Sequence, residues 1–221
     1  MHFSARIAVL LLPLLIPFSL VNSLLAPTES PESGKTCTNL TDTFDEAGFV
    51  LVPQLTPVGM YHGHTYGGFA TSSESKLLGT IGGVNAKSSP NVASSTILND
   101  LIQLGQLTLQ PFGNITASPS QYFDIYSGWL ACILMQGNPQ APALPSGCTV
   151  TVTGVGKDNN VVPEYTVSFS PTSLLANSMV FFQLPDTFRN LISVTFGVAT
   201  STVSPELSVL LLDDVTVCSY S

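Results

Sequence analysis

The stretch GMYHGHTYGGFA, Gly59 to Ala70, gathers the side chains best suited to chemistry. It holds His62 and His64, two of the three histidines of the chain. On a strand, residues two apart point to the same face. Such a pair can chelate Zn²⁺ or Cu²⁺ when a third ligand arrives from another segment. The first interpretation of this stretch is therefore a transition-metal site.

The same stretch is also compatible with sugar binding. Strand alternation would place Tyr66 with the two histidines and put Tyr61 on the other side. Aromatic rings stack on the apolar face of a sugar while polar groups take its hydroxyls. A glycan platform of Tyr61, His62, His64 and Tyr66 is the second interpretation. In the third, the histidines are simply hydrogen-bonded or exposed in a glycine-rich loop at a strand edge.

A second polar and aromatic stripe lies in SQYFDIYSGWLACILM, Ser120 to Met135. Alternation along this predicted strand puts Tyr122, Asp124 and Tyr126 on one face, which is the second candidate for a sugar-facing surface. Its alternative interpretation is the wet face of an ordinary amphipathic strand. Trp129, the only tryptophan, is expected in the core with the apolar residues of the opposite parity. These are Phe123, Ile125 and Ile133.

Motifs for catalysis are missing. A Ser-His-Asp triad would have to use His62 or His64, and the sequence has neither a G-x-S-x-G nor an H-E-x-x-H motif. A glycosidase needs two carboxylates at a suitable separation, and the candidates are scattered. They are Asp124, Glu164 and Asp186. We expect the protein not to be an enzyme.

The N-terminal sequence predicts secretion. Ile7 to Leu15 is uninterrupted apolar sequence, which is too short to span a bilayer and typical of a signal-peptide core. We expect the signal peptide at residues 1–23, with an alternative cut after residue 26. The Pro-, Ser- and Glu-rich residues 24–36 are expected to form a flexible arm. The mature protein is then extracellular, with no membrane partner after signal cleavage.

Charge excludes several partners. The chain has 14 acidic and six basic residues, and one basic residue, Arg6, leaves with the signal, so the mature net charge is about −9. Nucleic acid and anionic membrane surfaces are poor partners for such a chain. Two sequons, at Asn39 and Asn114, predict N-glycans on the surface of a glycoprotein.

The remaining sequence reads as short strands rich in β-branched residues and separated by turn residues. Valines and threonines alternate through Cys148–Val155, as in an antiparallel strand with one wet face. We expect one all-β domain at residues 37–221, a single jelly-roll-type antiparallel β-sandwich. Ala93–Leu104 is the one candidate helix. The other predicted strands are Thr43–Val52, Gly63–Ala70, Ser120–Met135, Pro163–Ser170, Met179–Pro185, Leu191–Thr200 and Glu206–Tyr220.

Four cysteines in an oxidising compartment predict two disulfides, and the sequence leaves three connectivities open. Cys132 and Cys148 flank a Pro- and Gly-rich connection, so a bridge there would close a local loop and stabilise by roughly 3 kcal/mol. Cys37 and Cys218 lie just before the first predicted strand and at the end of the last. Those strands are commonly neighbours in a jelly roll, which favours Cys132–Cys148 with Cys37–Cys218.

Several segments together resemble a group of fungal secreted β-sandwich proteins of unsettled function. They are TFDE (Thr43–Glu46), GGF (Gly67–Phe69), FDIYSGWLACIL (Phe123–Leu134), GCTVTVTG (Gly147–Gly154), FRNLISVTF (Phe188–Phe196) and LLLDDVTV (Leu210–Val217). The group is similar to jelly-roll, galactose-binding-like carbohydrate-binding modules, whose last strand carries a hydrophobic-Asp-Asp/Asn-Val motif. The resemblance implies the fold and a secreted glycan-binding role.

Two acidic pairs suggest a structural cation. Asp45 and Glu46 are expected in the first strand and Asp213 and Asp214 in the last, so neighbouring strands would bring the four carboxylates together. Ca²⁺ takes six to eight oxygen ligands and would offset their repulsion. Similar modules carry a structural calcium near this edge. In the alternative interpretation, these acids face solvent or bind loop amides.

Two functions remain open at this point. The first is a non-catalytic glycan-binding or cell-wall-associated module with a cell-wall or host glycan as its partner. The second is a secreted structural or host-interaction protein without a sugar ligand. A glycan-active hydrolase is a minor alternative.

Overall fold

The computed structural model describes residues 37–47, 56–75, 78–117, 121–135, 143–202 and 207–220. All of them lie within the unit Lys35–Ser221. The predicted signal peptide, at 1–23 or ending at 26, and the predicted arm at 24–36 lie outside the described residues and stay predictions.

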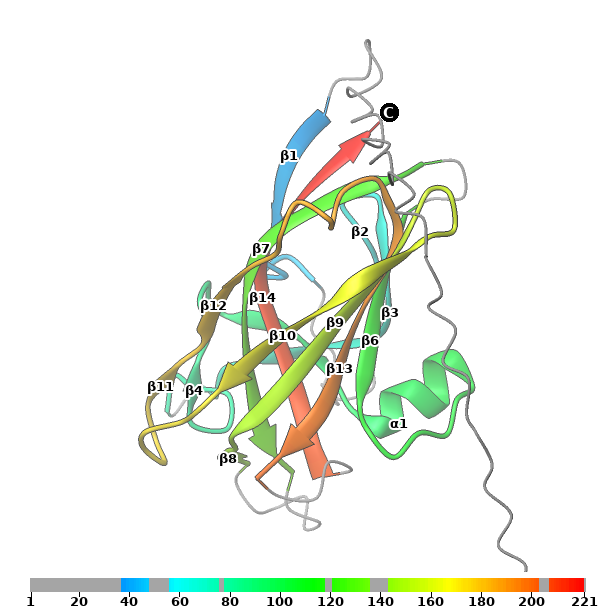
Figure 1. Ribbon diagram of the computed structural model, residues 1–221. Coiled ribbons are helices and arrows are strands. Elements are labelled where there is room, and N and C mark those ends of the chain that lie inside the picture. The colour runs from blue at the N-terminus through cyan, green and yellow to red at the C-terminus, as the bar shows by residue number, and fades with distance from the viewer. Residues whose placement is uncertain are drawn as a thin grey trace, which may run out of the picture. The chain divides into compact units, whose positions relative to one another are not determined.

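The described chain is built almost entirely from strands, with one short helical segment (Figure 1). The strands are β1 (Cys37–Asp42), β2 (Pro57–Tyr61), β3 (His64–Ser73), β4 (Val84–Asn85), β5 (Asn91–Ser95), β6 (Phe112–Ala117), β7 (Phe123–Leu134), β8 (Leu144–Pro145), β9 (Cys148–Gly156), β10 (Val161–Phe169), β11 (Asn177–Ser178), β12 (Val180–Gln183), β13 (Leu191–Ser201) and β14 (Ser208–Tyr220). The helical segment comprises α1 (Ile97–Asn99) and η2 (Asp100–Leu104).

The main sheet is antiparallel and runs in the order β10-β9-β13-β6-β3-β5-β14-β7-β12. β1 pairs with β14, β2 with β3 and β8 with β7. A single pair, Leu191 with Phe123, also joins β13 to β7, so the sheet folds back on itself. β4 and β11 form a separate parallel pair.

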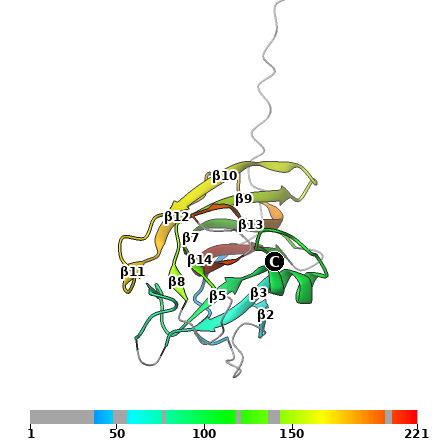
Figure 2. The same cartoon turned by 90° about the horizontal axis from the view of Figure 1, so that it is seen from below.

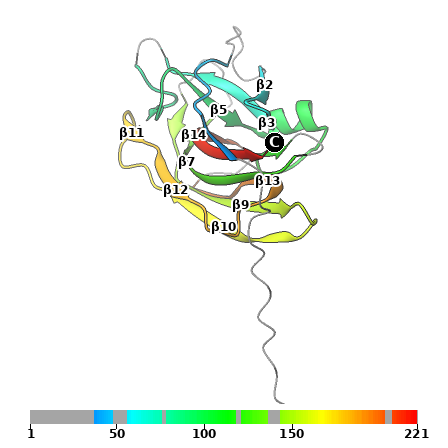
Figure 3. The ribbon, with the colours of Figure 1, turned by 90° about the horizontal axis from the view of Figure 1, so that it is seen from above.

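These strands form an all-β, antiparallel sandwich of jelly-roll type, which confirms the predicted fold class. In end-on views, β9 and β10 lie at one side of the domain and β2 and β3 at the other, with β7 and β14 between them (Figures 2 and 3). β9 alternates as predicted, because Val150 and Val152 are buried while Thr149, Thr151 and Thr153 are half-exposed. Large side chains from both layers fill the core.

Two disulfides tie the sandwich together in the pairing that the sequence favours. Cys37 and Cys218 join β1 to β14 with Cα atoms 5.6 Å apart. Cys132 and Cys148 join β7 to β9 across 6.1 Å. Such bridges are typical of proteins that fold in an oxidising compartment.

The first strand begins earlier in the chain than predicted. β1 starts at Cys37, and Thr43–Ala47, predicted as strand, forms a turn. Phe44 adopts a left-handed φ of 61°, which lies outside the β region of a regular strand, and its buried ring anchors the turn in the core. The rest of the predicted strand, residues 48–52, lies outside the described residues.

The predicted helix at Ala93–Leu104 is right only in its second half. Ala93, Ser94 and Ser95 belong to β5, where all five side chains are buried. The helical turn begins after Thr96, whose hydroxyl accepts a hydrogen bond from the Asn99 amide at 3.2 Å. Of the helices described, none is long and apolar enough to cross a bilayer.

Trp129 was expected in the core, but it lies half-buried on the outer face of β7 beside Phe181. The cause is a β-bulge, because Ser127 and Ile125 oppose the consecutive residues Thr216 and Val217 and leave Tyr126 as the extra residue. An extra residue reverses the parity of everything that follows it. Gly128 therefore faces inward, where a Cβ would lie 2.8 Å from the buried Phe182 ring.

Asp100 is a buried carboxyl that holds the loop after the helix. Its Oδ2 accepts hydrogen bonds from the Phe112 amide at 3.1 Å and the Thr108 hydroxyl at 3.3 Å. Its Oδ1 is buried with no hydrogen-bond partner among the described residues. Burial raises the pKa of Asp100 to about 7, although those two hydrogen bonds oppose the shift.

This carboxyl predicts a pH dependence of stability. Its pKa is higher in the folded than in the unfolded chain, so its contribution is complete below about pH 4 and is lost as the pH rises through about 7. We expect Asp100→Asn to lower the melting temperature more at pH 5 than at pH 8, or even to raise it at pH 8, because Asn keeps the neutral form at both pH values. Asp186→Asn, on a fully exposed side chain, is the control and should leave the profile unchanged. Equal effects of Asp100→Asn at both pH values would contradict the assignment.

Candidate functional site

The histidine stretch folds as a hairpin rather than as one strand. Tyr61 pairs with His64, and the two residues between them have φ values of 47° (His62) and 86° (Gly63). Positive φ at both central residues defines a type I′ turn, the usual two-residue connection of a hairpin. The two histidines therefore do not share a strand face, which the interpretation as a chelating pair requires, and His62 lies in a glycine-containing turn as in the third interpretation.

His62 forms an ion-pair geometry with a buried acid. Its Nδ1 lies 2.7 Å from Oδ1 of Asp42, while the Tyr66 hydroxyl donates to Oδ2 of the same carboxylate. Asp42 and Tyr66 are both fully buried. Burial, and next the charge of Asp42, raise the pKa of Tyr66 well above its usual value. The network fixes the end of β1 to the hairpin.

The side chains of His64 and Tyr61 also pack against buried aromatic rings. His64 is buried, with Nε2 3.1 Å from the Ser219 hydroxyl and its ring edge-on to Phe123 at 4.9 Å. Burial lowers the pKa of His64, so the neutral ring is favoured. Tyr61 is half-buried, with its ring 5.5 Å from that of Phe44. Since Tyr66 is buried too, the four side chains do not form one open surface, and His62 alone of them is exposed.

The second predicted stripe, by contrast, lies on the outer face of the sheet. Tyr122 and Tyr126 are half-buried, and a third tyrosine, Tyr220 from the end of β14, joins them. The rings of Tyr122 and Tyr220 stack with centroids 4.7 Å apart and an interplanar angle of 29°. We call Tyr122, Asp124, Tyr126 and Tyr220 the tyrosine cluster.

The carboxylate of Asp124 accepts hydrogen bonds from two tyrosines of this cluster. It is almost fully buried, and its Oδ2 accepts hydrogen bonds from the hydroxyls of Tyr220 at 2.8 Å and Tyr126 at 3.1 Å. Its Oδ1 accepts the amide of Asn190 at 2.8 Å. Asn190 has a left-handed φ of 54°, a conformation that asparagine tolerates better than most residues. Both phenol groups are therefore held in one orientation.

Arg189 packs against one ring of the cluster, that of Tyr126. Its guanidinium lies 4.1 Å from the ring centroid of Tyr126 and donates to the carbonyl oxygens of Ile125 at 2.7 Å and Phe188 at 3.1 Å. It also donates to the exposed Asp186 at 3.2 Å. The pKa values of Tyr126 and Tyr220 are raised, first by burial and then by Asp124, so both phenols keep their protons at neutral pH.

This arrangement suits recognition of neutral polar groups. Each phenol that donates to Asp124 still has lone pairs that can accept a hydrogen bond from a ligand hydroxyl. The rings present apolar faces next to these acceptors. Asp124 has three donors and is nearly inaccessible, so it serves to position the tyrosines.

Sequence reasoning named Tyr122 and Tyr126 as ligand residues and missed Tyr220 and Arg189. The expected proximity of the first and last strands involved Cys218, two residues before Tyr220. No pattern in the sequence gives the register of β14 against β7, which places Tyr220 next to Asp124.

One carboxylate of each acidic pair accepts hydrogen bonds from backbone amides. Asp213 is buried, and its carboxylate accepts from the amides of Lys87 at 2.8 Å, Ser88 at 2.9 Å and Asp214 at 2.8 Å. Asp45 accepts from the Asn91 amide at 3.1 Å. Asp45 and Glu46 follow β1 in a turn rather than lying within the first strand as predicted, and Glu46 is exposed.

The described part of the chain has no group of three or more His, Cys, Asp or Glu side chains able to hold a metal ion. The calcium site of Asp45, Glu46, Asp213 and Asp214 therefore stays a prediction. Asp213 and Asp45 have instead the alternative role foreseen for such acids, hydrogen bonding to loop amides.

The two sequons differ in their surroundings. Asn39 is exposed on β1. Asn114 is half-buried in β6, between β3 and β13, with its side chain against Gly67. Glycosylation of both stays a prediction, and Asn39 offers the more accessible amide.

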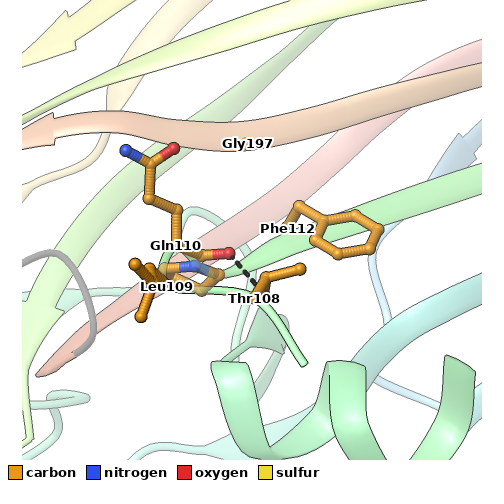
Figure 4. A pocket seen from close by; sticks show the side chains of 6 residues that line it. Thr108, Leu109, Gln110, Phe112 and Gly197 are labelled. Atoms are coloured by element: carbon orange, nitrogen blue, oxygen red, sulfur yellow. Dashed lines mark hydrogen bonds between the residues drawn. The ribbon is translucent and has the colours of Figure 1, made fainter. Parts of the chain in front are cut away.

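A hollow of about 460 Å³ lies beside β13, lined by Thr108–Phe112 and Gly197 (Figure 4). Thr108 donates to the carbonyl oxygen of Gln110 at 2.9 Å within it. No charged side chain lines this hollow. It lacks the combination of stacked rings and oriented hydroxyls that the tyrosine cluster has.

The buried network predicts a clear stability effect. Tyr66→Phe removes the phenol that donates to Asp42 and leaves a buried carboxylate oxygen unsatisfied, which should cost about 1–3 kcal/mol of unfolding free energy. Urea denaturation measures this. Tyr165→Phe, on a half-buried tyrosine of β10, is the matched control and should change stability less. Equal stability of Tyr66→Phe and the parent would refute the network.

No family model matches the sequence, and no curated protein matches it. Solved structures give distant similarities. A DUF4465 family protein from Bacteroides caccae aligns at 16% identity and a TM-score of 0.45, over 70% of this chain and 78% of that one. The K1 cleaved adhesin domain of Lys-gingipain from Porphyromonas gingivalis aligns at 14% identity and a TM-score of 0.41, over 81% of this chain and 97% of that one. The CBM22-1 xylan-binding domain of Xyn10C from Paenibacillus barcinonensis aligns at 14% identity and a TM-score of 0.38, over 85% of this chain and 97% of that one.

Proposed function

We propose that the protein is a secreted, non-catalytic glycan-binding module that binds its ligand through the tyrosine cluster on the outer face of β7 and β14. The observation that carries this proposal is the set of three tyrosines arranged around the buried Asp124, with two hydroxyls hydrogen-bonded to it. The ligand is a cell-wall or host polysaccharide outside the cell.

The geometry supports a sugar over other small ligands. Stacked Tyr122 and Tyr220 offer a rigid apolar surface, and the phenol oxygens of Tyr126 and Tyr220 lie beside it as acceptors. A pyranose ring has the same combination of an apolar face and an equatorial belt of hydroxyls. A row of partly exposed rings suits a polymer, whereas small molecules are usually bound in concave pockets.

The chemistry of Asp124 supports binding without catalysis. A glycosidase acid or nucleophile must reach the glycosidic oxygen or the anomeric carbon. The acceptor positions of Asp124 are occupied by two phenols and an amide, and the side chain is nearly inaccessible. We therefore assign Asp124 as a positioning residue.

Retention on insoluble polysaccharides tests the proposal. The mature protein should be retained on at least one of chitin, cellulose, β-glucan and mannan, without releasing reducing sugar. Tyr122→Ala and Tyr220→Ala should each weaken binding by about tenfold or more, because truncated aromatic contacts at interfaces commonly cost 1.4 kcal/mol or more.

Tyr165→Ala, on β10, is the control variant and should bind like the parent. Circular dichroism and melting temperature establish that each variant is folded. Unchanged retention of folded Tyr122→Ala and Tyr220→Ala would sink the assignment of the surface, and no retention on any polysaccharide would sink the function.

A second candidate is an interaction protein without a sugar ligand, favoured by a different surface. Five aliphatic side chains of the helical segment and the loop after it are exposed, and Leu107 and Leu109 are each 82% exposed. The others are Leu98, Leu101 and Ile102. Exposed apolar side chains that lie close together mark association surfaces. On this candidate the chain associates with a second copy of itself.

Sedimentation velocity tests this second candidate. Self-association should grow with concentration and be lost in Leu107→Ser/Leu109→Ser, because the change removes the two most exposed apolar side chains. Leu174→Ser/Leu175→Ser, at similarly exposed leucines before β11, should behave like the parent. A parent protein that stays monomeric at every concentration would eliminate this candidate.

A further inference from the structure

The positive charges of the described chain are concentrated on one surface. The described residues contain three cationic side chains, Lys87, Lys157 and Arg189. Each lies over an aromatic ring on the outer face of β7. Lys87 is 4.6 Å from the centroid of Trp129, Lys157 is 5.6 Å from that of Tyr122, and Arg189 is 4.1 Å from that of Tyr126.

The aromatic surface continues beyond the tyrosine cluster. After the bulge at Tyr126, Trp129 returns to the outer face and pairs with Phe181 of β12, with ring centroids 5.2 Å apart. Trp129 is half-buried and Phe181 is 49% exposed. Tyr122 and Trp129 lie at opposite ends of this line, which spans about 20 Å at the usual rise of a strand.

The two lysines are anchored through their backbones and not through their ammonium groups. The Lys87 amide donates to Asp213 at 2.8 Å, and the Lys157 amide donates to the Asn190 carbonyl at 2.8 Å. Both side chains are exposed, and no carboxylate of the described residues lies within ion-pair distance of either ammonium. Each ammonium is thus positioned at the aromatic surface and available to a ligand.

The acids of this face are less available than its lysines. Asp124 and Asp213 are buried, and amides and hydroxyls fill their acceptor positions. Asp186 is exposed, and Arg189 donates to it. A polymer on the rings therefore meets ammonium groups at both ends of the line. Glu74 lies near Lys87, because it accepts hydrogen bonds from the Ala86 amide at 3.2 Å and the Ser89 hydroxyl at 2.7 Å, and the exposed Asp158 directly follows Lys157. Neither acid lies within ion-pair distance of an ammonium, and charges beyond about 8 Å are screened at physiological salt.

We propose that the outer face of β7 is one elongated binding surface for an acidic polysaccharide, a chain of sugars that carries carboxylates such as those of uronic acids. Sugar rings stack along the line from Tyr122 to Trp129, and Lys157 and Lys87 bind carboxylates near its two ends. Binding displaces each ammonium from its ring, and a charge-assisted hydrogen bond to the carboxylate replaces that contact. The inference rests on the proposed glycan-binding function and names its ligand class.

The test compares two forms of one polymer, polygalacturonate and its methyl ester, which share a backbone and differ in charge. Calorimetric titration at about 0.15 M salt should give tighter binding to the free acid. Lys87→Gln/Lys157→Gln should lower that affinity by about tenfold and leave binding to the ester unchanged. Lys87→Arg/Lys157→Arg keeps the charges and should preserve the preference. Phe181→Ala should weaken binding to both forms, because it removes an exposed ring of the platform.

The outcomes separate this inference from the function on which it rests. Equal affinity for acid and ester, or a preference that survives Lys87→Gln/Lys157→Gln, would overturn the acidic ligand and leave the glycan module standing. Equally tight binding of poly-L-glutamate would overturn the inference too, since the surface would then recognise charge without sugar. Binding to neither form, together with no retention on the neutral polysaccharides, would remove both.

Discussion

The pairing of β7 with β14 is the constraint on which the rest of the molecule depends. Its register shifts twice, and each shift decides which side chains face outward. The bulge at Tyr126 turns Trp129 out of the core, and the second irregularity, between Asp213 and Thr216, contains Asp214 with a left-handed φ of 45°. Asp213, just before it, binds the loop that carries Lys87. Local irregularity therefore creates the outer surface, as bulges often do next to functional sites.

The two aromatic clusters of this protein use the same chemistry for opposite purposes. In each, tyrosine hydroxyls donate to a buried aspartate, Asp42 in one and Asp124 in the other. Tyr66 is enclosed by Phe44 and Phe69 and contributes stability. The rings around Asp124 stay half-exposed because they lie on the outer face, beyond the sandwich core. Burial, more than residue type, separates the structural cluster from the candidate site.

Sequence patterns predicted the sandwich because its strands alternate and its turns carry clear signals. The alternation of β9, the length of β14 and the preferred disulfide pairing could all be predicted from the sequence. The stripe of Tyr122, Asp124 and Tyr126 could also be predicted, because the bulge begins only at its last residue. Trp129 was misplaced because a single inserted residue leaves no mark in the pattern and reverses every later side chain.

The prediction of one continuous strand through the two histidines was wrong for a related reason. Tyr61-His62-Gly63-His64 contains the polar residue followed by glycine that type I′ turns prefer, but the alternating aromatic residues around it favour a continuous strand. Contacts distant in sequence could not be read either. Tyr220 reaches Asp124 across 96 residues and His62 reaches Asp42 across 20, and only the register of paired strands determines such meetings.

Rigidity explains why the buried Asp124 matters to a surface that binds through rings. A tyrosine free to rotate loses side-chain entropy when a ligand fixes it, and that loss subtracts from affinity. Tyr126 and Tyr220 are already held by their bonds to Asp124, and Tyr122 is stacked on Tyr220. The lysines at the ends of the line have no such constraint on their ammonium groups. In the proposed binding mode, the platform held by Asp124 sets the orientation of a sugar ring, and the two lysine ammonium groups at its ends bind carboxylates of the polymer.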